Sequence, residues 1–140
     1  MKRRTLSPLG ETEMEVLQHV WDLGRAPVAD VHARVLQTRE VAYTTVMTVM
    51  RKLARKGYLA YEKEGNAYVY SPARPPEEVR GRLLGELLDN VFRGSPQALV
   101  QTLARHEALS DDDVEEIRQI VESMRPGPAD RAAVGDDDDA

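Results

Sequence analysis

Residues 42–72 constrain the fold more than any other part of the chain. The first half of this segment has apolar side chains at helical spacing, and these form one buried stripe: Val46, Val49, Met50 and Leu53. Gly57 follows, and glycine is the usual residue just after a helix end. Two runs typical of strands, 58–64 and 67–71, then flank Gly65-Asn66, a two-residue hairpin signal. The segment therefore predicts a helix followed at once by a two-stranded β-ribbon.

The opposite face of this helix carries hydroxyls and cations. Hydroxyls near its start, above all Thr45 and Thr48, can reach base edges in a DNA major groove, and cations further along can reach phosphates. Lys56 is a further candidate phosphate contact, and the alternative is a merely solvated helix face. The predicted DNA-binding residues are Tyr43, Thr44, Thr45, Thr48, Arg51, Lys52, Arg55 and, on the ribbon, Lys63.

Two more helices are predicted upstream, at residues 11–23 and 28–37, with a short strand or turn at residues 25–27. Three short helices, the third basic and followed by a hairpin, are typical of a winged helix-turn-helix. We place this DNA-binding domain at residues 1–74. The side chains expected to point inward from the first two helices are Met14, Leu17, Val20, Trp21, Val31, Val35 and Leu36.

Residues 72–76 contain three prolines and are expected to form a hinge. Three amphipathic helices are expected after it, at residues 77–92, 97–106 and 111–124, and a capping signal at Ser110 opens the last. About fifty residues make a poor core alone, so residues 75–124 are predicted to dimerise with a second copy. The predicted interface residues are Leu83, Leu84, Leu87, Leu88, Val91, Leu99, Leu103, Ile117 and Val121.

The expected fold class is therefore mainly α with a small β-hairpin wing. It combines an N-terminal winged helix-turn-helix with a C-terminal three-helix dimerisation domain. Residues 125–140 are rich in Pro, Gly and Asp, and they are expected to form a disordered acidic tail.

Charge is distributed unevenly along the chain. Residues 1–74 carry 12 Lys and Arg against 8 Asp and Glu, whereas residues 75–140 carry 7 against 16. A basic first half is typical of a DNA-binding head joined to a partner module. The absence of Cys excludes disulfides and thiolate metal sites and fits a cytoplasmic protein. No apolar run approaches the ~20 residues that span a bilayer, so no membrane insertion is expected.

The remaining aromatic residues and histidines have structural interpretations. Met47 either touches a thymine methyl or packs against the second helix. His19 and His32 could meet as a metal or pH sensor, but satisfied surface histidines are the preferred interpretation. Packing across the ribbon is likewise preferred to base stacking for the clustered tyrosines, Tyr58, Tyr61, Tyr68 and Tyr70.

Catalytic motifs are absent from the sequence. We find no nucleophile and base at a spacing typical of a catalytic pair, no phosphate-binding glycine loop and no paired-histidine zinc motif. Neither an enzyme activity nor a metal or other cofactor is predicted.

The helix and ribbon resemble those of the penicillinase-repressor family, the BlaI/MecI/CopY type of bacterial winged-helix repressors, and the likeness extends over roughly residues 5–124. The residues that carry it are Leu9, Glu13, Glu15, Val16, Leu17, Trp21, Thr45, Val46, Thr48, Val49, Leu53, Lys56, Gly57, Leu59, Lys63, Gly65, Tyr70, Pro72 and Ser110-Asp111-Asp112.

This resemblance implies a homodimeric repressor on a dyad-symmetric operator. It also implies release through a membrane sensor metalloprotease, or its downstream protease, that leads to cleavage in the dimerisation domain. The family's Asn-Phe cleavage pair is matched here by Thr102-Leu103. This departure means that the resemblance does not imply the same cleavage, although a protease of different preference could act there. The copper-binding cysteines of one branch are absent, and Asn66 stands where the family often has Arg after the wing glycine.

A second hypothesis comes from another class of protein. Winged helices also serve as protein-interaction modules, and the acidic C-terminal half would then be the working surface. Such a module would show no DNA sequence preference, which separates the two hypotheses. The sequence does not distinguish a repressor from an activator.

Overall fold

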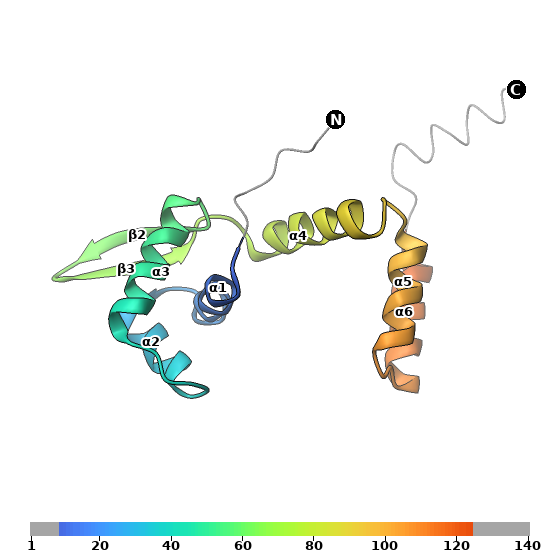
Figure 1. The fold of residues 1–140 in the computed structure, drawn as a ribbon, viewed down its shortest axis with the longest axis horizontal. Coiled ribbons are helices and arrows are strands. Elements are labelled where there is room, and N and C mark those ends of the chain that lie inside the picture. The colour runs from blue at the N-terminus through green and yellow to red at the C-terminus, as the bar shows by residue number, and fades with distance from the viewer. Residues whose placement is uncertain (1–8, 125–140) are drawn as a thin grey trace, which may run out of the picture. The chain divides into compact units, whose positions relative to one another are not determined.

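The computed structural model describes residues 9–124. It divides into two compact units, with the boundary between Val91 and Phe92, and each unit is described by itself. Residues 1–8 and the predicted tail at residues 125–140 lie outside the described residues. The elements of the N-terminal unit are α1 (Glu11–Leu23), β1 (Ala26–Pro27), α2 (Val28–Leu36), α3 (Tyr43–Arg55), β2 (Leu59–Glu64), β3 (Ala67–Pro72) and α4 (Pro76–Val91) (Figure 1).

The core of the N-terminal unit lies where α1, α2 and α3 meet the base of the hairpin. Each of the three helices buries one apolar stripe, as the helical spacing predicts. Leu36 is an exception: it was expected to point inward but is 48% exposed, because α2 ends at this residue. The core residues with the least exposure are Val16, Leu17, Val20, Ala26, Val31, Val35, Val46, Met50, Leu53, Tyr58 and Val79.

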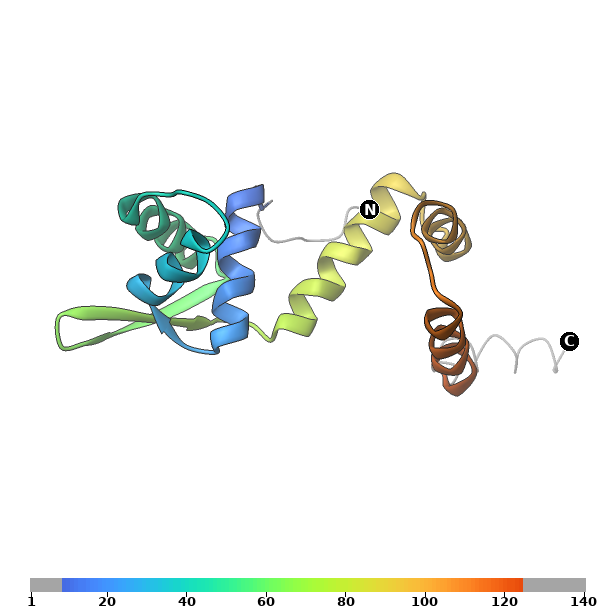
Figure 2. The ribbon, with the colours of Figure 1, turned by 90° about the horizontal axis from the view of Figure 1, so that it is seen from below.

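The sheet confirms the predicted hairpin and adds a short third strand. β1 and β2 both pair antiparallel with β3, which gives the order β1-β3-β2. At the hairpin tip, Glu64 pairs with Ala67 across Gly65-Asn66, and only the glycine of this turn has positive φ, +61°, as in type II′ turns. The hairpin projects beyond the helices in both views (Figures 1 and 2).

The junction between α3 and β2 is a glycine-dependent helix end. Gly57 has a φ of +92°, a conformation that L side chains rarely adopt. The Gly57 N–H donates to the Ala54 carbonyl and the Tyr58 N–H donates to the Leu53 carbonyl, the pair of bonds that defines a Schellman motif. This geometry turns the chain directly from α3 into the hairpin, so the helix and the ribbon have a fixed relationship.

The first half of helix α4 packs against the core of the N-terminal unit. Val79 is buried at 1% exposure, and Leu83 packs in part against the same core. The Arg80 guanidinium lies 5.0 Å from the centroid of the Trp21 ring, a cation–π contact between α4 and α1. The compact N-terminal unit therefore extends to Val91, beyond residue 74 where the predicted DNA-binding domain ends.

The C-terminal unit contains α5 (Pro96–His106) and α6 (Asp111–Ser123). The Ser95 hydroxyl caps α5 by accepting a bond from the Ala98 N–H. Ser110 and Asp113 form a reciprocal capping box on α6, which confirms the predicted start of that helix. No residue in the described part of this unit is buried.

The structure confirms the expected fold class, mainly α with a small wing. The predicted helix bounds differ from the observed ones by no more than one residue at either end, as is usual where helices fray. None of the described helices is long and apolar enough to span a membrane.

Candidate nucleic-acid interface

The first half of α3 presents a row of hydroxyls to solvent. Val46 and Met50 are fully buried on one side of the helix, whereas Thr44, Thr45 and Thr48 are exposed on the other. Tyr43 is 45% exposed at the first helical position. The structure therefore brings the predicted base-contacting residues together on one accessible face. Met47 is partly buried and packs against the hydrophobic core.

The start of α3 is left positively polarised. Ala42 at the cap position offers no side-chain acceptor for the first N–H groups, and no acidic residue lies in the first turn. This contrasts with α6, whose first turn contains three Asp residues. Unsatisfied N–H groups and the helix dipole both favour an external anion at this end.

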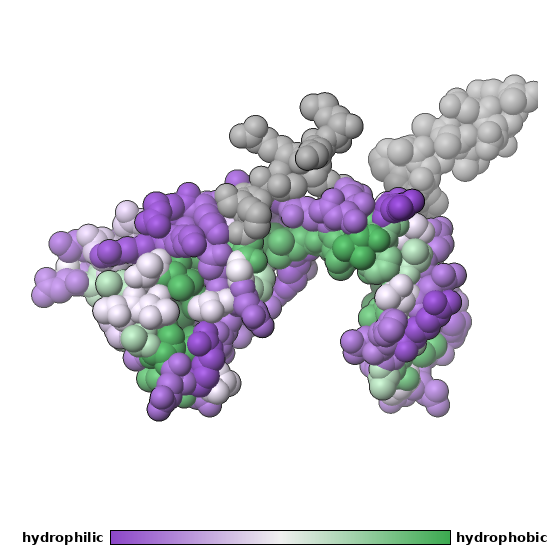
Figure 3. All heavy atoms as spheres, viewed as in Figure 1, coloured by the Kyte–Doolittle hydropathy of each residue, from purple (hydrophilic) through white to green (hydrophobic). Residues whose placement is uncertain are grey.

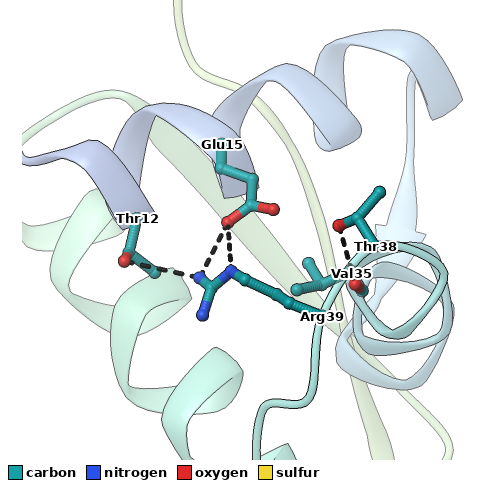
Figure 4. Close-up of polar contacts among 5 residues, drawn as sticks. All are labelled: Thr12, Glu15, Val35, Thr38 and Arg39. Carbon is teal, nitrogen blue, oxygen red and sulfur yellow. Dashed lines mark hydrogen bonds and ion pairs between the residues drawn. The ribbon is translucent and has the colours of Figure 1, made fainter.

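Two side chains hold the turn between α2 and α3. The Arg39 guanidinium donates to Glu15 Oε1 at 2.8 Å and to Thr12 Oγ1 at 3.5 Å, which ties the turn to α1 (Figure 4). Nearby, the Thr38 hydroxyl donates to the Val35 carbonyl, which closes the end of α2. These contacts orient α3 relative to the first helix.

His32 fixes the other side of the same turn. Its Nε2–H donates to the Val41 carbonyl at 2.8 Å, and its ring meets Tyr43 edge to face at a centroid distance of 5.6 Å. His32 therefore positions the first residue of α3, a role that the sequence did not signal. Among the described residues, no three potential metal ligands of the His, Cys, Asp or Glu type come together.

Among the described residues, the cations on the second half of α3 and on the wing form no ion pair. Arg51, Lys52 and Arg55 are exposed on α3 and Lys63 is exposed on β2, and none of the four forms an ion pair within residues 9–124. Elsewhere, arginines such as Arg34 and Arg39 do pair with carboxylates. Unpaired, exposed cations that share one side of the molecule form a site for a polyanion.

Lys56 was expected on this basic face but lies elsewhere. Its side chain is only 19% exposed, and its ammonium donates to Glu13 Oε1 at 2.8 Å. Burial by itself would raise the pKa of the Glu13 carboxyl. Bonds from the Gly10 N–H and from Lys56, together with the charge of Lys52, outweigh burial and lower this pKa below its usual range. Lys56 is therefore part of the scaffold.

The two faces of the hairpin differ in charge. Residues directly opposite each other share a face, and so do residues two apart on one strand. Lys63 opposite Tyr68 and Tyr61 opposite Tyr70 therefore form one face, which we call the tyrosine face. Glu62 and Glu64 lie on the other face, where Arg25, the residue just before β1, pairs with both carboxylates. No local pattern indicates this role of Arg25, because the contact joins residues far apart in the chain.

The four tyrosines of this region divide into two pairs. Tyr58 and Tyr70 are buried at 1% and 3% exposure, and burial raises the pKa of each hydroxyl. Tyr61 and Tyr68 are 55% and 44% exposed and meet edge to face, with ring centroids 5.4 Å apart. Packing across the ribbon was expected for all four, and Tyr61 does contact Tyr68 and Tyr70 across it. Tyr61 and Tyr68 nevertheless stay about half exposed and do not enter the core.

Helices α4, α5 and α6 expose most of the apolar side chains predicted to dimerise. Figure 3 shows a hydrophobic strip along the lower edge of α4. Leu83 packs in part against the N-terminal core, and Leu88 and Leu99 are half-buried. The Thr102–Leu103 bond lies inside α5. The exposed members of the predicted interface are Leu84, Leu87, Val91, Leu103, Ile117 and Val121.

Comparison with known proteins gives a family match over most of the chain. The sequence model of the penicillinase repressor family matches residues 9–123. The transcriptional regulator BlaI of Mycobacterium tuberculosis is 30% identical over 132 residues, which cover 93% of this chain and 94% of that protein. The penicillinase repressor of Bacillus licheniformis is 23% identical over 122 residues, which cover 87% and 95%. The solution structure of the DNA-binding domain of the repressor BlaI covers 54% of this chain and 93% of that one, at 24% identity and a TM-score of 0.48.

Proposed function

The chain belongs to the penicillinase repressor family, and we propose that it is a transcriptional repressor that binds operator DNA through α3 and the β2–β3 wing. Relatives that match along nearly their whole length are named as a transcriptional regulator and as a penicillinase repressor. This function involves no enzymatic activity and no cofactor, and it places the protein in the cytoplasm with its DNA.

One observation carries the proposal: the side of α3 opposite the core combines exposed hydroxyls with unpaired cations. Thr45 and Thr48, one helical turn apart, are assigned to base edges, and Thr44 and Tyr43 to the bases or backbone beside the helix start. Arg51, Lys52 and Arg55 are assigned to phosphates, and Lys63 adds a backbone contact from the wing. An α-helix of this kind fits the major groove.

The unpartnered apolar side chains of α4–α6 support a homodimer. Ile117 and Val121 are one turn apart on α6 and are 39% and 60% exposed in the single chain. A second copy can cover these and the other exposed apolar residues through a two-fold interface. We assign residues 1–74 to DNA binding and residues 75–124 to dimerisation. Two-fold symmetry then requires an inverted-repeat operator, with half-site centres one or two helical turns apart.

Release from the operator is assigned to an upstream signal that weakens the dimer. Proteolysis by a membrane sensor metalloprotease or its downstream protease is the route that the family resemblance suggests. The matching Thr102–Leu103 bond lies in the middle of α5, whose backbone bonds must open before a protease can cut there. Cleavage at this bond would separate α6 from the rest of the chain.

Selection of bound sequences from a random duplex pool tests the function. The full chain is used at about 150 mM salt, where nonspecific phosphate binding is suppressed. The expected result is an enriched motif with dyad symmetry. If a folded, dimeric sample enriches no motif, the repressor hypothesis is refuted and the hypothesis of a protein-interaction module is favoured.

A further inference from the structure

A groove lies between the second half of α3 and the tyrosine face of the hairpin. Its volume is about 410 Å³, which is within the size range of small-molecule sites. We call it the wing groove. It is lined by Arg51, Ala54, Arg55, Tyr61, Tyr68 and Tyr70.

The charge of the wing groove suits an anion. Arg51 and Arg55 are four residues apart on one helix face, and neither has a carboxylate partner among the described residues. No acidic side chain lines the groove. The nearest acids of the wing, Glu62 and Glu64, lie on the opposite ribbon face with Arg25. A guanidinium binds a planar carboxylate or a phosphate through two parallel bonds, so two of them give strong selection for such a group.

The walls of the groove are aromatic. Tyr61 stands edge to face with Tyr68 and lies tilted by 43° against Tyr70, at centroid distances of 5.4 and 5.5 Å. Tyr61 and Tyr68 are both about half exposed, so part of each ring is open to solvent. Exposed aromatic rings beside guanidinium groups favour a flat ring that stacks and is anchored by its charge. Inorganic phosphate would satisfy the arginines but leave the ring faces uncovered.

We propose that the wing groove is a binding site for a small planar aromatic anion, an aryl carboxylate or aryl phosphate. Its acidic group binds Arg51 and Arg55, and its ring lies against Tyr61 and Tyr68. This binding requires no DNA. The regulatory consequence rests on the proposed function: because DNA phosphates are assigned to the same two arginines, the ligand and the operator exclude each other.

Binding is tested on the full chain without DNA, by NMR titration with benzoate and phenyl phosphate. Cyclohexanecarboxylate and inorganic phosphate are the matched probes that lack an aromatic ring. We expect dissociation constants on the order of 1 mM for the aryl anions and values at least about fivefold weaker for the other two. Equal affinity for benzoate and cyclohexanecarboxylate would overturn the proposal. So would the absence of benzoate binding at about 20 mM.

Two variants locate the site. Tyr61→Leu removes one aromatic wall, and Arg55→Gln removes one guanidinium while keeping a polar side chain. Each should weaken benzoate at least about fivefold, whereas Arg34→Gln, whose arginine pairs with Asp22, should not. Thermal unfolding followed by circular dichroism checks that each variant is folded. Unchanged benzoate affinity in folded Tyr61→Leu and Arg55→Gln proteins would place the ligand elsewhere and refute the assignment.

The competition between ligand and operator is tested by displacement of a labelled operator duplex. Benzoate should displace the duplex from the parent chain, and cyclohexanecarboxylate at the same concentration should displace several-fold less. Simultaneous binding of benzoate and operator would overturn the competition. The two failures are distinguishable: a chain that binds operator but no aryl anion refutes the groove, whereas one that binds aryl anions but enriches no DNA motif refutes the repressor.

Discussion

The ammonium of Lys56 lies 2.8 Å from Glu13 Oε1, and this contact joins the C-terminal end of α3 to the first turn of α1. The same carboxylate oxygen accepts the Gly10 N–H at 2.8 Å, so one atom caps α1 and anchors α3. The side chains of Lys56 and Glu13 are 19% and 10% exposed, and an ion pair this sheltered is poorly screened by water. The helix that we propose to face DNA is therefore held at its C-terminal end by a charge pair.

Replacing Glu13 by Gln should destabilise the N-terminal unit by about 3 kcal/mol, because it leaves a largely buried ammonium without its counter-charge. Urea unfolding followed by Trp21 fluorescence measures the change. Glu15→Gln is the matched control: it breaks the more exposed pair with Arg39 and should cost less than about 1 kcal/mol. Equal losses in the two variants would contradict a special role for Glu13.

The pH dependence of stability follows from the lowered pKa of Glu13. In the unfolded chain this carboxyl titrates near its ordinary value of 4.5, and in the folded chain it titrates lower. Its contribution is fully present above 4.5 and is lost as the pH falls through the folded value. Unfolding free energies measured in steps from neutral pH to about pH 3 should fall more steeply for the parent chain than for Glu13→Gln. Parallel curves would show that the ion pair adds no pH-dependent stability.

Thr48→Ala and Arg51→Ala should separate base reading from phosphate binding. Loss of the Thr48 hydroxyl should weaken operator binding about tenfold and leave nonspecific binding nearly unchanged. Loss of Arg51 should weaken both and reduce the salt dependence by about one phosphate per subunit. Fluorescence anisotropy over a salt series, with operator and scrambled duplexes, measures both effects. If Thr48→Ala leaves operator affinity unchanged, the base-contact assignment is wrong.

Arg25 should affect DNA binding through the carboxylates that it neutralises. In Arg25→Ala, Glu62 and Glu64 carry uncompensated charge on the wing, so DNA affinity should fall several-fold at low salt and less at high salt. Adding Glu62→Gln and Glu64→Gln should restore the affinity. Arg34→Ala, which breaks an exposed pair with Asp22 on α1, is the control. No recovery in the triple variant would mean that Arg25 touches DNA itself.

Val121→Asp should convert the proposed dimer to a monomer, because a charge would be placed in the two-fold apolar interface. Sedimentation equilibrium should give twice the chain mass for the parent protein at micromolar concentration and one chain mass for the variant. Gln119→Asp, a change of the same charge at another exposed α6 position, is the control. A parent mass of one chain would refute the homodimer.

Local signals explain why so much of the fold could be predicted from the sequence. Gly57 and Gly65 occupy positions where φ is positive, and Ser110 caps α6, so each of these ends is encoded by residues beside it. Helical spacing identified the buried stripe of α3 because Val46, Met50 and Leu53 share one face. The fold class follows from these elements and their order.

Contacts between residues far apart in the sequence explain where the structure differs from the sequence prediction. Spacing assigns Lys56 to the polar face of α3, but it does not reveal that Glu13 of α1 lies over that end of the helix. Arg25 reaches the wing acids and His32 reaches the Val41 carbonyl only in the folded chain. The DNA-contact and dimer assignments depend on molecules outside this chain, and they stay predictions.

The alternation of side chains along β2 also has a consequence for how this wing can vary. Tyr61 and Lys63 share one face and Glu62 and Glu64 the other, so a single-residue deletion that shifts the pairing of β2 with β3 by one position would exchange the two sets. The side that now presents Lys63 would then present the two carboxylates, although composition and total charge would hardly change. Insertions and deletions in this strand therefore matter by whether they shift the pairing by an odd or an even number of residues. A shift by two residues keeps each charged side chain on its face of the wing, whereas a shift by one moves it to the other face.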